Sequence, residues 1–179
     1  MVDCRDAVLV VVDVQGKLAQ IMTDKDQLFK NCQILVKSSK ILEIPMLWCQ
    51  QVPKALGPTI PAIADELVDI EPINKSSFSC WGDPVFRERL CALNREQILL
   101  CGIESHICVA QTAIDCSRHG FKVHWISDAI SSRTPFSRDI ASQRALQHQI
   151  QCSSVEMILF SLLQNAKHPQ FKDIACLIK

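Results

Sequence analysis

The run Ala7-Val8-Leu9-Val10-Val11-Val12 sets the architecture of this chain. Its residues are apolar and mostly β-branched, without the polar alternation of a half-exposed strand. This pattern is typical of a strand that is covered on both faces of a parallel sheet. We therefore expect a central strand, with the carboxylate of Asp13 directly at its end.

Further strand-like runs alternate with helical patterns along the chain. Over 26–43, apolar residues recur every three to four positions, which predicts a helix with one buried face, and Pro45 ends it. This alternation predicts a single-domain, doubly wound (Rossmann-like) α/β fold over residues 1–179, with a mostly parallel sheet and helices on both faces. The other expected elements are strands at 46–49, 71–79, 97–102, 122–127 and 151–154, helices at 83–93, 105–119, 137–149, 155–164 and 169–178, and a loop at 50–61.

Composition excludes several classes of protein. The chain has 179 residues, 48% of them hydrophobic, with 19 Lys plus Arg against 19 Asp plus Glu. With no net charge, the chain has no overall field that would recruit a nucleic acid or an anionic membrane. The apolar run near the start is too short for a signal peptide core or a membrane span. We expect a cytoplasmic protein with no membrane or nucleic acid partner.

The cysteine pattern indicates free thiols. The chain has ten cysteines, and several lie within apolar runs such as Ile98-Leu99-Leu100-Cys101. Buried cysteines of this kind are typical of a reducing compartment. There is no C-x-x-C pair, so zinc-ribbon and thioredoxin-like sites are excluded and no structural metal is expected.

Three residues stand where an open α/β sheet binds its ligands, at the carboxyl ends of strands. Asp13 follows the first strand, and Lys75 follows Ile73-Asn74. Cys108 lies three residues after Ser105, the expected N-cap of a helix, where free N–H groups and the helix dipole lower the pKa of a thiol.

Each of the three residues also has a simpler interpretation. Asp13 could cap a turn, Lys75 could be a solvated surface charge, and Cys108 could be a core thiol. Together they form a more specific set, because a nucleophilic thiol needs a proton acceptor and a nearby cation favours its ionised form. His106 lies near Cys108 in sequence but is expected to point away from the thiol, as a pocket or surface residue.

Five ordered motifs carry a family resemblance. They are Val12-Asp13-Val14-Gln15, Asn74-Lys75-Ser76-Ser77-Phe78-Ser79, Cys101-Gly102-Ile103-Glu104-Ser105-His106-Ile107-Cys108-Val109 followed by Gln111-Thr112-Ala113, Asp128-Ala129-Ile130-Ser131-Ser132-Arg133, and His168-Pro169-Gln170-Phe171-Lys172. With these motifs the chain resembles the isochorismatase-like cysteine hydrolases over nearly its whole length, and most closely the eukaryotic isochorismatase domain-containing proteins.

The resemblance implies a mechanism. The family's catalytic Asp, Lys and Cys fall on Asp13, Lys75 and Cys108. The Cys108 thiolate would attack the carbonyl of a small amide-like substrate and form a thioester acyl-enzyme, while Asp13 carries the proton. A cis peptide between Ile103 and Glu104 is also implied, with an oxyanion hole made by the N–H groups of Glu104 and Cys108.

The sequence departs from two kinds of family member. Members that hydrolyse nicotinamide have a metal-binding Asp-x-His segment, where this chain has Trp48-Cys49-Gln50-Gln51-Val52-Pro53. We therefore expect no metal and no other cofactor. Members that act on isochorismate do not need the cysteine, so Cys108 argues against that substrate.

The pocket and the assembly are further expectations. Substrate contacts are expected from Gln15, Phe78, Trp81, Glu104 and Phe136. The resemblance implies a homo-oligomer, a dimer or larger. An apolar stripe near the end of the chain could join the interface or could pack on the protein's own sheet: Phe171, Ile174, Leu177 and Ile178.

Two other functions remain open at this point. The chain could be an interaction or scaffold module that keeps the fold after losing its substrate. A nuclease is the weakest hypothesis, because the sequence has neither a basic patch nor a carboxylate cluster for two metal ions.

Overall fold

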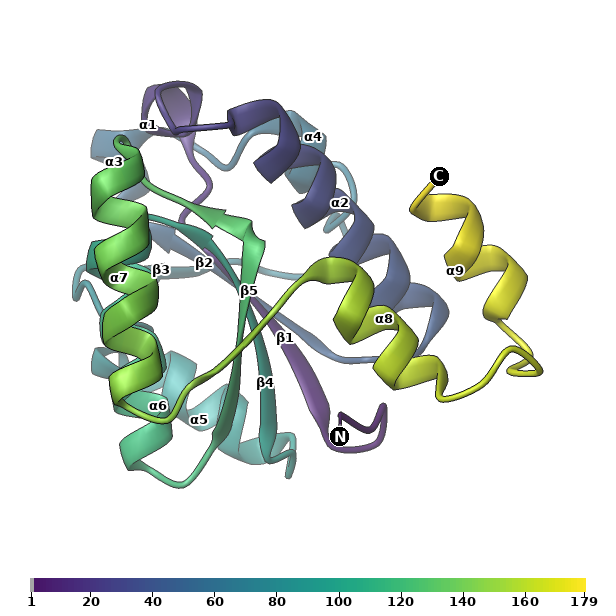
Figure 1. Ribbon diagram of the computed structural model, residues 1–179. Helices are drawn as coiled ribbons and strands as arrows, with labels where there is room; N and C mark the ends of the chain where they lie inside the picture. The colour runs from purple at the N-terminus through teal and green to yellow at the C-terminus, as the bar shows by residue number, and fades with distance from the viewer. Residues whose placement is uncertain (1) are drawn as a thin grey trace.

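The strand β1 (Ala7–Val12) lies inside a six-stranded parallel sheet in the computed structural model, which describes residues 2–179 (Figure 1). The strand order is β3-β2-β1-β4-β5-β6, so the chain changes direction across the sheet between β1 and β4. In doubly wound sheets, ligands bind outside the carboxyl ends of the strands at this switch point. The other strands are β2 (Met46–Gln51), β3 (Ile73–Lys75), β4 (Gln97–Ile103), β5 (Lys122–Ser131) and β6 (Gln151–Ser153).

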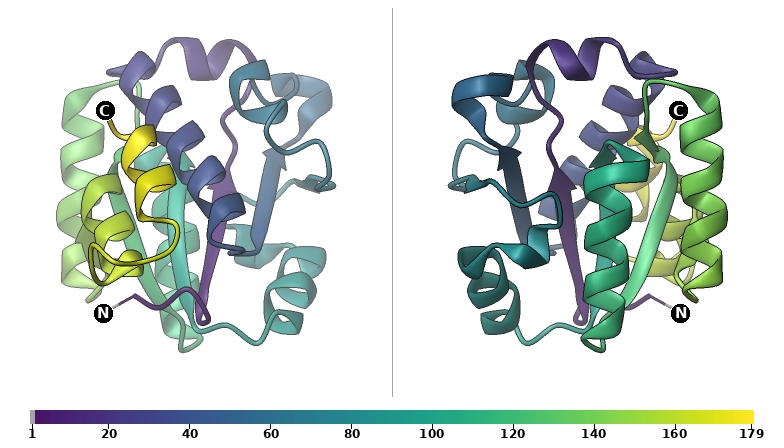
Figure 2. Two further views of the ribbon diagram at one scale, coloured as in Figure 1. Left: turned by 90° about the vertical axis from the view of Figure 1, so that its right-hand side faces the viewer. Right: turned by 90° about the vertical axis from the view of Figure 1, so that its left-hand side faces the viewer.

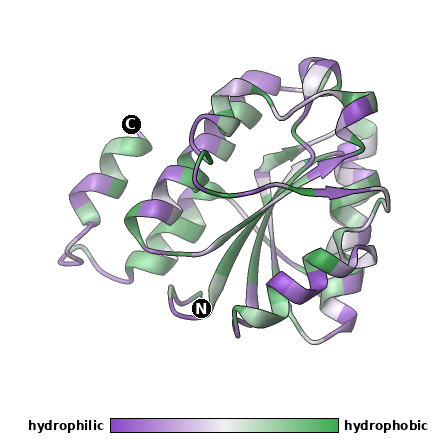
Figure 3. Cartoon of the chain, turned by 180° about the vertical axis from the view of Figure 1, so that it is seen from behind, coloured by the Kyte–Doolittle hydropathy of each residue, from purple (hydrophilic) through white to green (hydrophobic). Residues whose placement is uncertain are grey.

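Every residue of β1 is buried, as the apolar run predicts. Leu9 and Val11 belong to one core cluster, whereas Val8 and Val10 belong to a second cluster on the opposite face of the sheet. The hydropathy colours in Figure 3 show green strands at the centre of the fold. This two-sided burial explains why the strand carries no polar side chain.

Helices cover both faces of the sheet (Figure 2). Three of them, α2, α8 and α9, lie on one face, and α5, α6 and α7 lie on the other. The expected doubly wound fold is therefore confirmed. The helices are α1 (Gly16–Gln20), α2 (Lys25–Ile41), α3 (Pro53–Leu56), α4 (Pro61–Ala64), α5 (Pro84–Ala92), α6 (Ala110–Arg118), α7 (Pro135–Gln147), α8 (Val155–Leu163) and α9 (Phe171–Leu177), with a short 3₁₀ turn η1 (Cys80–Gly82) and a π-helical turn η2 (Ser105–Val109).

Several expected boundaries were wrong. The expected loop at 50–61 contains the end of β2 and the short helix α3, and α4 starts at its last residue; both helices begin at a proline. The expected strand at 71–79 is limited to Ile73–Lys75. Ser105 is not an N-cap, because its hydroxyl pairs with that of Ser132 and the chain forms the π turn η2 before α6 starts.

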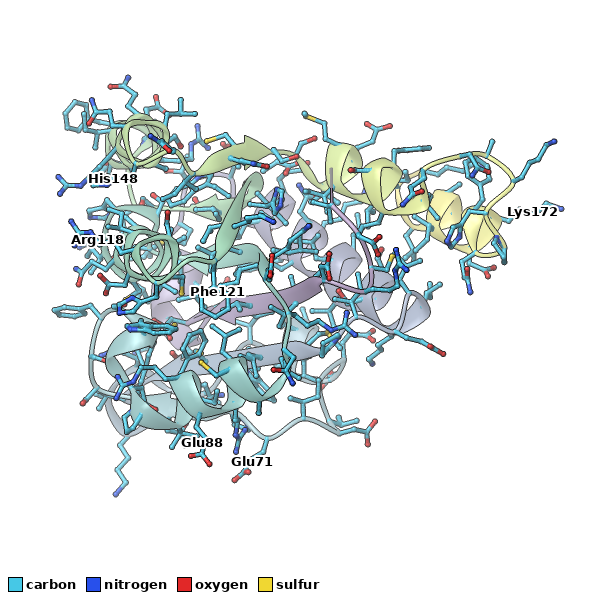
Figure 4. All side chains as sticks on the ribbon, turned by 90° about the horizontal axis from the view of Figure 1, so that it is seen from below. Glu71, Glu88, Arg118, Phe121, His148 and Lys172 are labelled. Carbon is cyan, nitrogen blue, oxygen red and sulfur yellow. The ribbon has the colours of Figure 1, made fainter. Side chains whose placement is uncertain are left out.

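The apolar stripe of the last helix packs within its own chain. Ile174 is fully buried, and Phe171 meets Phe160 of α8 with its ring edge, at 6.2 Å between ring centroids. Leu177 and Ile178 pack against the core beneath α2. Seen from below, the polar face is outside: Lys172 points away from the molecule, at the end opposite Arg118 and His148 (Figure 4). No helix within residues 2–179 is long and apolar enough to cross a membrane.

Candidate active site

Asp13 stands directly after β1, at the switch point of the sheet. Its backbone adopts a left-handed conformation (φ 52°), and its N–H donates to Cys49 O of β2 at 3.1 Å. The residue is 2% exposed, and its Oδ2 lies 2.6 Å from the Lys75 ammonium. The other oxygen, Oδ1, has no hydrogen-bond partner among the described residues. One half of this carboxylate is therefore fixed, and the other half is available.

Lys75 ends β3 and is not a surface charge. Its side chain is fully buried. Besides Asp13, its Nζ donates to Gln51 Oε1 at 2.6 Å and to the carbonyls of Ser77 (3.2 Å) and Phe78 (3.1 Å). A buried ammonium is stable only with such compensation. Lys75 is thus a fixed cation behind the Asp13 carboxylate.

Cys108 lies in the turn η2, after the end of β4. The peptide bond between Ile103 and Glu104 is cis. The Glu104 carbonyl then accepts from the N–H groups of Ile107 and Val109, at 3.1 and 3.2 Å. These bonds bring Cys108 to the same edge of the sheet as Asp13, and the thiol is 7% exposed.

A segment after β5 holds this turn from the other side. The Ser132 hydroxyl bonds to the hydroxyl of Ser105 and lies 2.8 Å from His106 Nδ1. His106 is engaged with Ser132 and is not among the residues that line the cavity next to Cys108. The turn is therefore tied to β5 on one side and to β4 on the other.

The electrostatics of the site correct one expectation about Cys108. Burial, followed by the negative charge of Asp13, raises the pKa of the Cys108 thiol to about 12, although Lys75 acts in the opposite direction. The expectation of a lowered thiol pKa was wrong, because desolvation and the Asp13 carboxylate outweigh the helix-terminus effect. In the resting site, Cys108 is a neutral thiol.

The pKa values of Asp13 and Lys75 are also shifted. Burial raises the pKa of Asp13, although Lys75 and the Cys108 thiol oppose this effect. Burial alone lowers the pKa of Lys75, but Cys80, Asp13 and Cys108 together raise it above its ordinary value. Lys75 therefore stays charged, and Asp13 is a stronger proton acceptor than an exposed carboxylate.

A small cavity of about 90 Å³ opens at these residues. The expected residues Phe78 and Glu104 line it, and Glu104 Oε1 accepts from Arg133 Nε at 3.0 Å. The remaining lining residues, apart from Asp13 and Cys108, are Leu18, Gln51, Leu56, Ile103 and Ile107. Of these, Leu18, Gln51, Leu56 and Ile107 were not expected from the sequence.

Three expected pocket residues are not part of this cavity. Gln15 is fully buried, and its amide is occupied by Gly57 O (2.7 Å), Gln51 O (3.2 Å) and Gln51 N (2.6 Å). Gln15 therefore ties the end of β1 to the end of β2 and to Gly57, and both N–H groups of its amide are already used.

Trp81 and Phe136 do not line the cavity. The Trp81 ring stacks on His119, at 4.3 Å between centroids, and packs against Phe121. Because α6 runs away from Cys108, His119 lies about 15 Å along the helix from the thiol. Phe121 lies at the end where the strands begin (Figure 4). Phe136 is 77% exposed at the start of α7, outside the cavity lining.

The described residues offer no obvious metal site. Within residues 2–179, no three His, Cys, Asp or Glu side chains gather in a way that could hold an ion.

The fold and site define a Rossmann-like α/β protein with an aspartate, a lysine and a cysteine gathered beside the switch point. The isochorismatase domain model matches residues 7–157. Isochorismatase domain-containing protein 2 of Danio rerio is 35% identical over 97% of this chain and 87% of its own length. The chain belongs to the isochorismatase family of hydrolases.

Two solved structures share the fold. The MAR1 ribonuclease from Caenorhabditis elegans has a TM-score of 0.93 at 31% identity, covering 99% of this chain and 91% of that one. YcaC from Escherichia coli, an octameric hydrolase of unknown specificity, also has a TM-score of 0.93, at 22% identity, covering 99% of this chain and 88% of its own.

Proposed function

We propose that the protein is a cysteine hydrolase of small amide-like substrates, with Asp13, Lys75 and Cys108 as its catalytic residues. One observation carries the proposal. The Asp13 carboxylate is paired with Lys75 through Oδ2, whereas Oδ1 is buried without a partner, in a residue that lines a cavity together with Cys108. A buried, unpartnered acceptor beside a thiol is suited to proton transfer.

The proposed first half-reaction forms an acyl-enzyme. Cys108 Sγ attacks the carbonyl carbon of the amide, and its proton passes to Asp13 Oδ1 during the attack because the resting group is a thiol. The N–H groups of Glu104 and Cys108 would hold the oxyanion. Asp13 then gives the proton to the leaving nitrogen, the C–N bond breaks, and a thioester remains on Cys108.

Water completes the cycle. Asp13, again ionised, takes a proton from a water molecule as that water attacks the thioester carbonyl. The C–S bond breaks, the carboxylic acid leaves, and the proton returns to Cys108. Lys75 keeps the Asp13 carboxylate charged between the two half-reactions.

RNA hydrolysis is a weaker proposal for this chain, although the C. elegans relative is described as a ribonuclease. The lining residues include Asp13 and Glu104 but no Lys, Arg or His. A phosphate in this cavity would face carboxylates without a free cation, which is costly.

Activity of the variant Cys108→Ala tests the proposal. With a panel of short primary amides, we expect the wild type to release ammonia and the variant to lose about a thousandfold or more in rate. Cys91→Ala, which removes an exposed thiol, is the control and should keep full activity. Hydrolysis that survives Cys108→Ala would contradict the mechanism.

Protein capture tests the alternative function. A stoichiometric partner that binds wild type and Cys108→Ala equally, in a protein that hydrolyses no amide, would favour the scaffold hypothesis.

We further propose a cytoplasmic location and self-assembly. All ten cysteines are free, and six of them are buried, which fits a reducing compartment. The octameric state of the structural relative YcaC makes a homo-oligomer the first assembly to test.

A further inference from the structure

The charged side chains that line the cavity are all acidic. Asp13 and Glu104 are its only titratable lining residues besides Cys108, among those that the structure describes. The two nearby cations are already paired with carboxylates of the protein. Lys75 is fully buried behind Asp13, with four acceptors around its ammonium. Arg133 pairs with Glu104, but its side chain is 53% exposed whereas that of Glu104 is 6% exposed. Solvent therefore screens the Arg133 charge more than the Glu104 charge.

The acidic side chains of the cavity also offer free hydrogen-bond acceptors. Asp13 Oδ1 has no partner among residues 2–179, and only one oxygen of Glu104, Oε1, is used by Arg133. Gln51 Oε1 accepts from Lys75, and Gln51 Nε2 donates one of its two N–H groups to Ser76 O at 2.8 Å. The two free carboxylate oxygens favour a ligand that supplies N–H groups, and a primary carboxamide supplies two.

Size and wall polarity limit the rest of the ligand. The cavity is small, with a volume of about 90 Å³. The other walls come from Leu18, Leu56, Phe78, Ile103 and Ile107. Such a space fits a carbonyl group and the first few carbons of an apolar acyl chain.

Building on the proposed function, we propose that Glu104 and Asp13 make this cavity selective for uncharged primary carboxamides with short apolar acyl groups. A substrate with a carboxylate or a phosphate near the reacting carbon would lose its water shell without gaining a cation. Glu104 is then a specificity-determining residue, in addition to the oxyanion role of its backbone.

A pair of alkylating reagents that differ only in charge tests this proposal without any turnover. Iodoacetamide is neutral and iodoacetate is anionic. The rate of labelling at each cysteine is measured by peptide mass spectrometry with both reagents. The exposed Cys91 and Cys176 give the intrinsic rate ratio within the same molecule. We expect the iodoacetamide-to-iodoacetate ratio at Cys108 to exceed that reference about tenfold or more.

A charge variant identifies the residue responsible. Glu104→Gln keeps the side-chain shape and removes the charge, so the ratio at Cys108 should move toward the reference. Glu156→Gln, at an exposed position of α8, is the matched control and should leave the ratio unchanged. A wild-type ratio at Cys108 equal to that of the exposed cysteines overturns charge selectivity and leaves the hydrolase proposal standing.

Hydrolysis of butyramide and succinamate separates the two proposals further. Both are primary amides of four carbons, but only succinamate carries a carboxylate. Preferential hydrolysis of butyramide supports both proposals, and equal hydrolysis overturns the selectivity alone. Selective labelling of Cys108 without hydrolysis of any amide contradicts the hydrolase and leaves the selectivity as a binding property. Because the resting Cys108 is a thiol, both reagents label it slowly, so the ratio of the two rates is the readout rather than either rate alone.

Discussion

At the level of single residues, the site depends on how one carboxylate is shared. Asp13 gives one oxygen to Lys75, and its other oxygen has no partner among the described residues and is the proposed acceptor of the Cys108 proton. The same negative charge raises the pKa of the thiol that it is proposed to activate. Asp13 thus disfavours a free thiolate at rest, and in the proposed mechanism it accepts the proton only when a carbonyl is attacked. A resting thiol is less open to oxidation and alkylation than a thiolate.

The variant Asp13→Asn separates these two effects. It removes the negative charge but leaves Lys75 in place, so the pKa of Cys108 should fall below its wild-type value of about 12. At roughly pH 8, iodoacetamide should label Cys108 faster in the variant than in the wild type, because a larger fraction is thiolate. Amide hydrolysis should nevertheless fall by about a hundredfold or more, since the proton acceptor is lost.

The control for this prediction is Asp83→Asn, which changes a carboxylate that caps α5 away from the cavity. This variant should change neither the labelling rate of Cys108 nor the rate of amide hydrolysis. Slower labelling of Cys108 in Asp13→Asn would contradict the electrostatic account, because it would mean that Asp13 does not hold the thiol in its neutral form.

At the level of elements, sequence reasoning succeeded where the signal is local. Asp83 caps α5 through its own side chain, which accepts from Val85 N and Phe86 N, and the Asp-Pro pair predicted that start correctly. The β1 run predicted its burial because every one of its side chains is apolar. The order of Asp13, Lys75 and Cys108 at strand ends also followed from the sequence, since parallel strands end at one edge.

The predictions that were wrong concern residues whose hydrogen-bond partners are distant in sequence. The hydroxyl of Ser105 meets that of Ser132, and this pairing rather than capping accompanies the π turn. Gln15 was expected to contact substrate, but its amide binds backbone groups of Gln51 and Gly57. Strand-end position predicts which edge a residue occupies, but not which neighbour takes its hydrogen bonds.

Gly102 explains how β1 and β4 approach each other at the switch point. It adopts φ +121° next to Val12, and a Cβ at this position would clash with the Val12 carbonyl. Asp13 follows Val12 directly, so any shift here also moves the carboxylate. Only glycine combines this backbone conformation with such close contact.

Two glycine-to-alanine variants measure this contact. Gly120 also has a positive φ (+92°), but nothing lies within 4 Å of an added Cβ. Gly120→Ala should lower the free energy of unfolding by about 1–2 kcal/mol, the cost of the backbone conformation alone. Gly102→Ala should cost about 1–3 kcal/mol more, because the side chain also clashes. Urea unfolding measures both values, and equal losses would contradict a close approach at Gly102.

For the whole molecule, the proposed self-assembly needs a surface that could join two copies. The stripe on α9 is covered by its own chain, since Ile174 is fully buried. Apolar side chains are left exposed at α7, where Phe136 and Ile140 are 77% and 48% exposed and lie one helical turn apart. Assembly would bury this pair, because exposed apolar neighbours gain free energy when they leave water.

The variant Phe136→Asp tests α7 as the contact between copies. We expect light scattering of the wild type to give a mass above the 20.1 kDa of one chain, and Phe136→Asp to shift the protein toward that value. Met157 on α8 is similarly exposed, at 63%, and Met157→Asp adds the same charge to a different surface. If both variants dissociate equally, added charge rather than the α7 contact is responsible. A monomeric wild type would remove self-assembly from the account and would leave the site complete within one chain.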